Sequence, residues 1–85
     1  MSYFIDMRTA AEYRRGHLAA SINVPLDDVK KIETLIPDRD ASIYLYCATG
    51  KNSACARSVL RYLGYNHVHN LGTTAEAEEF FSRHK

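Results

Sequence analysis

The residues of this chain whose types and spacing could do chemistry centre on one cysteine. Cys47 follows an apolar, β-like run at residues 42–46. A short polar stretch that contains Gly50 and Lys51 then separates it from a helical pattern. A structural cysteine is usually buried inside an element, whereas this one stands between two elements. We therefore interpret Cys47 as a free thiol that performs chemistry.

The position of Cys47 favours the thiolate form of its side chain. In an open parallel sheet, reactive groups lie beyond the carboxyl ends of strands, and the helix that follows presents unpaired N–H groups and a partial positive charge there. Such surroundings lower a cysteine pKa from about 8.5 to as low as ~3.5–7.5. Gly50 also permits a loop whose N–H groups form an anion-binding nest. The pattern predicts a nucleophilic thiolate.

The charges that follow Cys47 along the chain are basic. No acidic residue occurs between Asp40 and Glu76. The basic residues of that stretch are Lys51, Arg57 and Arg61. We expect a locally basic site and a small anionic substrate, in a chain whose net charge of +1 gives no case for binding nucleic acid.

The elements that must position Cys47 alternate between strands and helices. β-like runs cover residues 3–6, 21–25, 42–46 and 67–71, and helical patterns cover residues 9–16, 26–35, 53–63 and 75–83. Thr9 and Glu12 have the spacing of a capping box. The alternation predicts an α/β fold with a mostly parallel sheet covered on both faces, in a single domain over residues 1–85.

Composition and motifs exclude several classes of protein. No apolar stretch approaches the roughly 20 residues of a membrane span, and the first residues lack a signal-peptide core. A chain as written would stay in the cytoplasm, and one whose signal peptide had been trimmed would be periplasmic. Cys47 and Cys55 are too few and too close for a disulfide framework. His67 and His69 lack a third ligand at metal spacing, so no metal is expected. We expect a monomer.

Three segments resemble the successive motifs of the single-domain rhodanese-like sulfurtransferases, most closely the phage shock protein E type. They read FIDMRTAAEYRRGHLAASINVPL, YCATGKNSACARSVLRYLGY and VHNLG. They occur in the family's order over nearly the whole chain. The resemblance implies a rhodanese-like fold with a central parallel five-stranded sheet flanked by helices. It also implies that Cys47 is the catalytic residue of a six-residue loop, residues 47–52.

The same resemblance implies the reaction. Cys47 would take a sulfane sulfur from thiosulfate or a similar donor, become a persulfide, and pass the sulfur to a thiol or, in the usual assay, to cyanide, with no cofactor. The loop and the start of the helix would bind the donor, which makes the substrate-binding candidates Ala48, Thr49, Gly50, Lys51, Asn52 and Ser53.

The chain departs from the family's pattern in two places. Lys51 and Asn52 stand where many members carry a loop arginine, and a lysine supplies charge without a bidentate fork. Residues 72–73 read Gly-Thr where a Gly-Gly pair commonly follows the last strand.

Three other functions are alternatives to sulfur transfer. A cysteine-dependent phosphatase needs an arginine six residues after the cysteine, and that position holds Ser53. A dithiol oxidoreductase normally shows C-x-x-C, which Cys47 and Cys55 do not form. A catalytically weak rhodanese module, serving in sulfur relay or partner binding, is the alternative that stays open.

Several other residues receive structural interpretations. Asp6 and Arg8 are expected to form an ion pair, and His17 to hydrogen-bond in a turn. Cys55 is expected to pack in the core, with a resolving thiol as the alternative. Sheet and helix packing is expected of Tyr44, Tyr46, Tyr62 and Tyr65.

Overall fold

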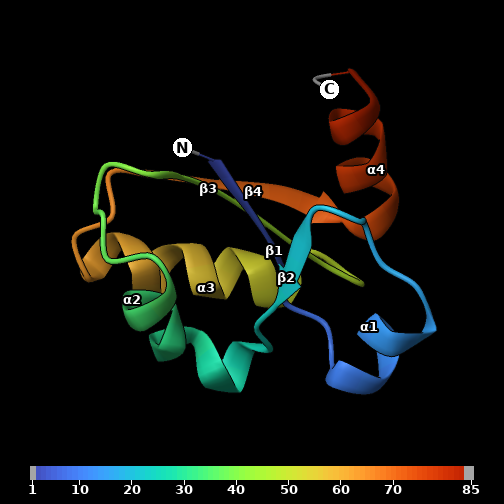
Figure 1. The fold of residues 1–85 in the computed structure, drawn as a ribbon, viewed down its shortest axis with the longest axis horizontal. Helices are drawn as coiled ribbons and strands as arrows, with labels where there is room; N and C mark the ends of the chain where they lie inside the picture. Colours follow the sequence, from blue (N-terminus) through green and yellow to red (C-terminus); the bar gives the residue numbers. More distant parts are fainter. Residues whose placement is uncertain (1, 84–85) are drawn as a thin grey trace.

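The computed structural model describes residues 2–83, which alternate between strands and helices (Figure 1). The strands are β1 (Ser2–Asp6), β2 (Ser21–Asn23), β3 (Ser42–Cys47) and β4 (His67–Thr73). The helices are α1 (Ala10–Arg15), the 3₁₀ helix η1 (Leu26–Lys31), α2 (Ile32–Leu35), α3 (Lys51–Tyr62) and α4 (Thr74–Arg83). Each predicted run therefore holds an element. Of the predicted domain, Met1, His84 and Lys85 lie outside the described residues.

Within the described residues the strands form one parallel sheet in the order β2-β1-β3-β4. The predicted α/β class and the parallel pairing are confirmed. The expectation of five strands is wrong for residues 2–83, which form four. After β4 the chain enters α4 directly, because Thr73 caps that helix and the residues beyond it have helical rather than alternating spacing.

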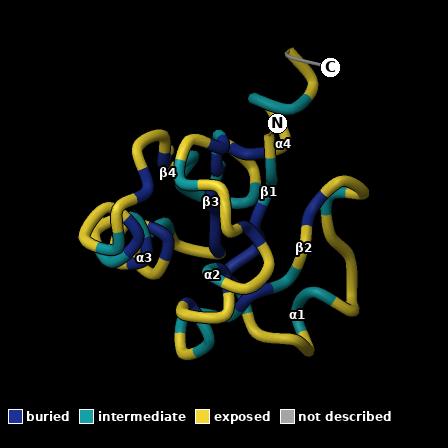
Figure 2. Tube along the Cα trace, turned by 60° about the vertical axis from the view of Figure 1, so that its left-hand side comes forward, coloured by how far each residue is buried: buried dark blue, intermediate teal, exposed yellow. Residues whose placement is uncertain are grey.

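One face of the sheet carries the apolar core. Ile5, Ile43 and Leu45 are completely buried there and belong to one cluster with Ala56 and Leu60 of α3. Figure 1 shows α2 and α3 on this side of the sheet, and Figure 2 shows the buried stretches along β1, β3 and α3. Each large side chain buried in this way contributes about 1.5–3 kcal/mol. The core therefore holds the end of β3 against the start of α3.

The opposite face carries a row of stacked rings. Phe4, Tyr44 and His69 occupy matched positions on adjacent strands, with ring centroids 5.2 Å and 4.9 Å apart. α4 adds Phe80, 5.2 Å from the Tyr44 ring, and Phe81, edge-on at 5.3 Å from Phe4. Such contacts fix α4 on this face, so helices flank the sheet on both sides as expected.

The predicted helix over residues 26–35 is two short helices. η1 begins after Pro25, and Asp28 has a non-helical backbone (φ −104°, ψ 15°). The apolar spacing that suggested one helix nevertheless buries Val29 and Ile32 in the core. Just before η1, the hydrogen bond from the Val24 N–H to the Asp6 carbonyl oxygen joins the chain to the end of β1.

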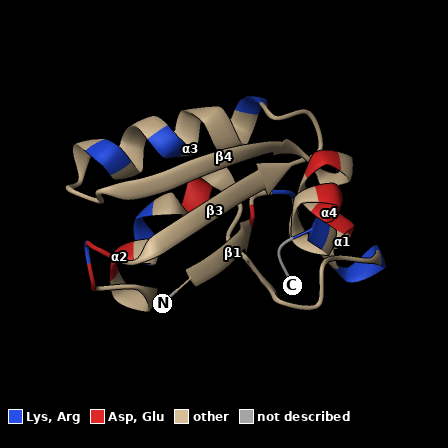
Figure 3. Cartoon of the chain, turned by 90° about the horizontal axis from the view of Figure 1, so that it is seen from above, with Lys and Arg blue, Asp and Glu red and all other residues tan. Residues whose placement is uncertain are grey.

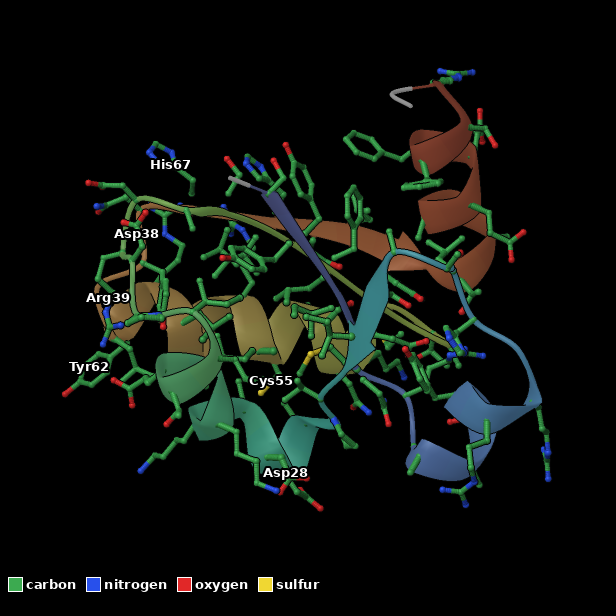
Figure 4. The ribbon with its side chains drawn as sticks, viewed as in Figure 1. Asp28, Asp38, Arg39, Cys55, Tyr62 and His67 are labelled. Atoms are coloured by element: carbon green, nitrogen blue, oxygen red, sulfur yellow. The ribbon has the colours of Figure 1, made fainter. Side chains whose placement is uncertain are left out.

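Two packing predictions on α3 are wrong. Cys55 is exposed, and Tyr62 is 90% exposed and points away from the sheet (Figure 4). The two residues are seven apart and therefore share one side of the helix, which faces solvent. The core is served instead by Ala56 and Leu60, on the neighbouring stripe. The packing predicted for Tyr46 and Tyr65 is confirmed, since both are buried.

Candidate active site

Cys47 ends β3 beside a cavity of about 360 Å³. The cavity lies where the segment after β1, the first turn of α1, the start of η1 and the Cys47 loop meet. Its lining residues from the chain before β3 are Met7, Arg8, Thr9, Glu12, Pro25, Leu26 and Asp27, and those that follow are Cys47, Ala48, Thr49 and Asn52. A cleft beyond the carboxyl ends of parallel strands is the usual place for a site in this architecture.

The loop after Cys47 is shorter than predicted. α3 begins at Lys51, so only residues 48–50 separate strand from helix. Gly50 caps the helix at φ 84°, and a Cβ atom there would lie 3.4 Å from the Gly72 Cα. The left-handed conformation at this position favours glycine. Lys51 and Asn52 accordingly belong to the first turn of α3.

The sulfur of Cys47 accepts a hydrogen bond from the Gly50 backbone and contacts the Ser53 hydroxyl. The Gly50 N–H donates to Sγ at 2.9 Å, and the Ser53 Oγ lies 3.5 Å from Sγ. Burial raises the pKa of Cys47, a residue that is 2% exposed, but the Ser53 hydroxyl and the backbone N–H groups that follow Cys47 lower it by more. The net pKa lies below the ordinary thiol value, which favours the thiolate.

Three of the six predicted donor-binding residues line the cavity, and three do not. Ala48, Thr49 and Asn52 line the cavity with Cys47. Ser53 is completely buried behind the sulfur. The Gly50 N–H faces the sulfur, and Lys51 is exposed and outside the lining of the cavity.

The expectation of a locally basic site is wrong for the walls of the cavity. The charged residues that line it are Arg8, Glu12 and Asp27. The basic residues of α3 do not line it, and Figure 3 shows them spread along that helix. Counting charges along the chain failed because α1 and η1, which are distant in sequence, bring two carboxylates to the cavity.

A buried ion pair supports the cavity from the β1 side. The Arg8 guanidinium donates to both carboxylate oxygens of Asp6 at 2.8–3.0 Å, which confirms the predicted pair. Arg8 Nη2 also donates to the Gly16 carbonyl at 2.6 Å. The Tyr46 hydroxyl donates to Asp6 at 3.0 Å. Burial, together with the Asp6 carboxylate, raises the pKa of Tyr46 to about 12. These bonds hold the ends of β1 and β3 together.

Sequence reasoning missed two features around the site. Asn70 on β4 approaches Ser53 at 2.7 Å, and nothing in the run HVHNL distinguishes it from other polar strand residues. Thr73 and Glu76 exchange the hydrogen bonds of a capping box, so the threonine that replaces the second glycine of the family's pair caps α4. The spacing that identified Thr9 could have identified this second box.

Residues 2–83 contain no group of three or more His, Cys, Asp or Glu side chains placed to hold a metal ion. No helix in this part of the chain has the length and apolar character needed to cross a membrane.

The chain is similar in sequence to two known proteins. The chain is 38% identical over 71 residues to thiosulfate sulfurtransferase PspE of Escherichia coli, a match that covers 82% of this chain and 68% of PspE. It is 36% identical over 63 residues to the adenylyltransferase and sulfurtransferase uba4 of Ogataea parapolymorpha, covering 74% of this chain but only 16% of uba4.

A solved structure and a family model indicate the same family. The fold matches a rhodanese with anions from E. coli at a TM-score of 0.85 and 35% identity, covering 89% of this chain and 91% of that one. Residues 1–74 match the rhodanese-like domain. With the parallel sheet and the cysteine loop at its carboxyl edge, these matches establish that the chain belongs to the rhodanese-like domain family.

Proposed function

We propose that this chain is a sulfurtransferase that carries a sulfane sulfur on Cys47. The observation that supports this most directly is the Cys47 sulfur itself, which lines a cavity while the Gly50 N–H donates to it at 2.9 Å. A thiolate held in this way is a nucleophile at neutral pH. The likeness to PspE favours thiosulfate as the donor.

The proposed first step forms a persulfide. The Cys47 thiolate attacks the outer sulfur of thiosulfate, the S–S bond of the donor breaks, and sulfite leaves with the bonding electron pair. The terminal sulfur of the persulfide then carries the negative charge, and the N–H groups of the loop stabilise that charge. No proton, metal or external oxidant is consumed.

The proposed second step returns the enzyme to its starting state. A thiolate acceptor or cyanide attacks the terminal sulfur, the bond between that sulfur and Sγ breaks, and the Cys47 thiolate leaves. With cyanide the product is thiocyanate. Ala48, Thr49 and Asn52 line the cavity through which donor and acceptor would reach the sulfur.

Intact mass after incubation with thiosulfate tests the proposal. We expect the protein to gain one sulfur atom and to lose it when cyanide is added, with thiocyanate released. A catalytically weak relay or binding module would gain no sulfur from thiosulfate, and that result would contradict the proposed function. The Cys47→Ser variant is the control, since it lacks the accepting sulfur.

A further inference from the structure

The side chain of Asn70 reaches the active site from β4. Its Oδ1 accepts the Gly72 backbone N–H at 2.9 Å and lies 2.7 Å from the Ser53 Oγ. The Gly72 N–H can only donate, so the atom that faces it is the amide oxygen and not the amide nitrogen. The same oxygen can only accept, which makes the Ser53 hydroxyl the donor of the 2.7 Å bond.

The Ser53 hydroxyl has a single proton and several acceptors within reach. Its Oγ lies 2.7 Å from Asn70 Oδ1, 3.1 Å from the Gly50 carbonyl oxygen and 3.5 Å from Cys47 Sγ. Ser53 is completely buried, so solvent does not reach its hydroxyl to relieve this competition. The position of that proton therefore depends on the state of the sulfur.

The competition differs between the two forms of Cys47. A thiol can donate its S–H to the Ser53 Oγ while the hydroxyl donates to Asn70, so both hydrogen bonds exist together. A thiolate can only accept a hydrogen bond. To donate to it, the Ser53 hydroxyl must point its proton at the sulfur and no longer at Asn70. Ionisation of Cys47 then costs the bond between Ser53 and Asn70.

We propose that Asn70 is a positioning residue that restrains the ionisation of Cys47 by drawing the hydroxyl proton of Ser53 away from the sulfur. It acts through Ser53 and contacts no substrate. The same amide oxygen holds the N–H of Gly72, whose backbone lies against Gly50, the donor to the sulfur. The carboxyl end of β4 is thereby connected to the protonation state of the nucleophile.

Charged and titratable groups lie on the elements next to the Cys47 loop. They are the Asp6–Arg8 pair, Glu12, Asp27, Tyr46, Lys51 and Glu76. Charges act through space as well as through contacts. A test of Asn70 must therefore compare variants that leave these groups unchanged, so that their contributions cancel.

A double-mutant cycle isolates the role of Asn70. The rate of Cys47 alkylation by iodoacetamide is measured against pH in a Cys55→Ser background, which removes the exposed second thiol. We expect Asn70→Ala to lower the midpoint by about 0.4–1 pH unit, the equivalent of one net hydrogen bond. Ser53→Ala should raise the midpoint. Adding Asn70→Ala to Ser53→Ala should produce no further shift.

Two further variants complete the design. Asn66 is an exposed asparagine whose side chain donates to Asp40, away from the Cys47 loop, so Asn66→Ala should leave the midpoint unchanged. Asn70→Asp retains an acceptor for both donors and adds a negative charge, so it should raise the midpoint, and by less when Ser53 is alanine. This variant keeps the test decisive if Asn70→Ala does not fold.

Two outcomes would overturn the proposal. One is an Asn70→Ala shift of the same size with and without the Ser53 hydroxyl, which would assign the effect to the backbone of β4 at Gly72. The other is an unchanged or higher midpoint in folded Asn70→Ala. The proposal rests on the proposed function only in taking Cys47 as the nucleophile. Alkylation reports ionisation whether or not thiosulfate donates sulfur, so the two can fail separately.

Discussion

At the scale of single residues, the state of Cys47 depends on hydrogen-bond donors that oppose its burial. A buried thiol in apolar surroundings would keep its proton, since desolvation penalises the charged form. The Gly50 N–H and the Ser53 hydroxyl reverse that preference at 2.9 Å and 3.5 Å from the sulfur. The lowered pKa of Cys47 therefore depends on short hydrogen bonds more than on the formal charges of the chain.

The two cysteines should behave differently when they are replaced. Cys47→Ser should abolish sulfur transfer, because the serine hydroxyl cannot form a persulfide. Cys55→Ser should retain activity within about a factor of two, because Cys55 is exposed and does not line the cavity. A surface substitution of this kind usually changes the free energy of unfolding by no more than about 0.5 kcal/mol. Thiocyanate formation by both variants, with folding checked by circular dichroism, measures this. An equal loss in both would favour a two-thiol mechanism.

The pH dependence of alkylation should reveal the lowered pKa of Cys47. A thiolate stabilised in the folded protein remains ionised at pH values where an ordinary thiol is protonated. We expect the rate to rise with pH and to reach its plateau with a midpoint below ~8.5, the value of a free thiol. Measurement in the Cys55→Ser background avoids the second cysteine. A midpoint at or above the free value would contradict the stabilisation by Ser53 and the loop N–H groups.

Lys51 should affect donor binding only at a distance. Its side chain is exposed and does not line the cavity, so its attraction for thiosulfate is screened over roughly 8–10 Å at moderate salt. Lys51→Ala should raise the KM for thiosulfate by roughly 1.5- to 5-fold at low salt and less at high salt.

A matched control for Lys51 lies at the other end of the same helix. Arg61 is exposed in the last turn of α3, and Arg61→Ala should leave KM unchanged. A large KM increase in Lys51→Ala that persists at high salt would mean that the lysine contacts the donor directly.

At the scale of elements, the site depends on how β3 passes into α3. Gly50 allows α3 to begin three residues after β3 and directs its N–H at the sulfur, while the Gly72 backbone near the end of β4 lies next to it. The start of α3 and the end of β4 therefore meet at the cysteine loop. A side chain at residue 50 would strain the left-handed backbone that holds this N–H in place.

Gly50→Ala should destabilise the protein and slow Cys47 alkylation together. A left-handed conformation for alanine costs about 1–3 kcal/mol. Gly64→Ala is the matched control, because Gly64 also has a positive φ (99°) but lies away from the Cys47 loop, where a Cβ atom would meet only the Arg39 side chain at 3.9 Å. It should lose about 1–2 kcal/mol in urea unfolding and leave alkylation unchanged. Unaltered alkylation in Gly50→Ala would separate the loop geometry from the reactivity of the sulfur.

At the scale of the whole molecule, one polar network joins three of the four described strands. Asp6 is completely buried and binds Arg8 and Tyr46, while the Asn23 side chain donates to the carbonyls of Asp6 and Arg8 at 3.0 Å. The Tyr46 hydroxyl also lies 3.1 Å from the Ser21 Oγ on β2. A domain of this size has a total stability of only about 4–13 kcal/mol. The network is therefore a large part of what keeps the carboxyl edge of the sheet intact.

Asp6→Asn should cost far more stability than Tyr46→Phe. Removal of the carboxylate leaves the largely buried Arg8 charge without its partner, which costs about 3–5 kcal/mol. Removal of the tyrosine hydroxyl leaves the ion pair intact and should cost about 1–2 kcal/mol. Urea denaturation of both variants measures the difference. Equal losses would mean that the hydroxyl, and not the ion pair, holds β1 to β3.

The amino-acid sequence by itself determined the order of the strands and helices and the position of Cys47 at the end of a strand. Apolar spacing, the capping box at Thr9 and the placement of Cys47 at a strand end depend only on residues close together in the chain. They can therefore be recognised without the tertiary structure. The Asp6–Arg8 pair was predictable for the same reason, since the two residues are neighbours along one strand end.

The tertiary structure alone decided what surrounds the sulfur. Glu12 and Asp27 reach the cavity, and Asn70 reaches Ser53, only because parallel pairing places the ends of separate strands side by side. The orientation of α3 likewise exposed Cys55, which its sequence neighbours had suggested was buried. Charge and hydrogen bonding act through distances in space, and residues far apart in the chain set those distances.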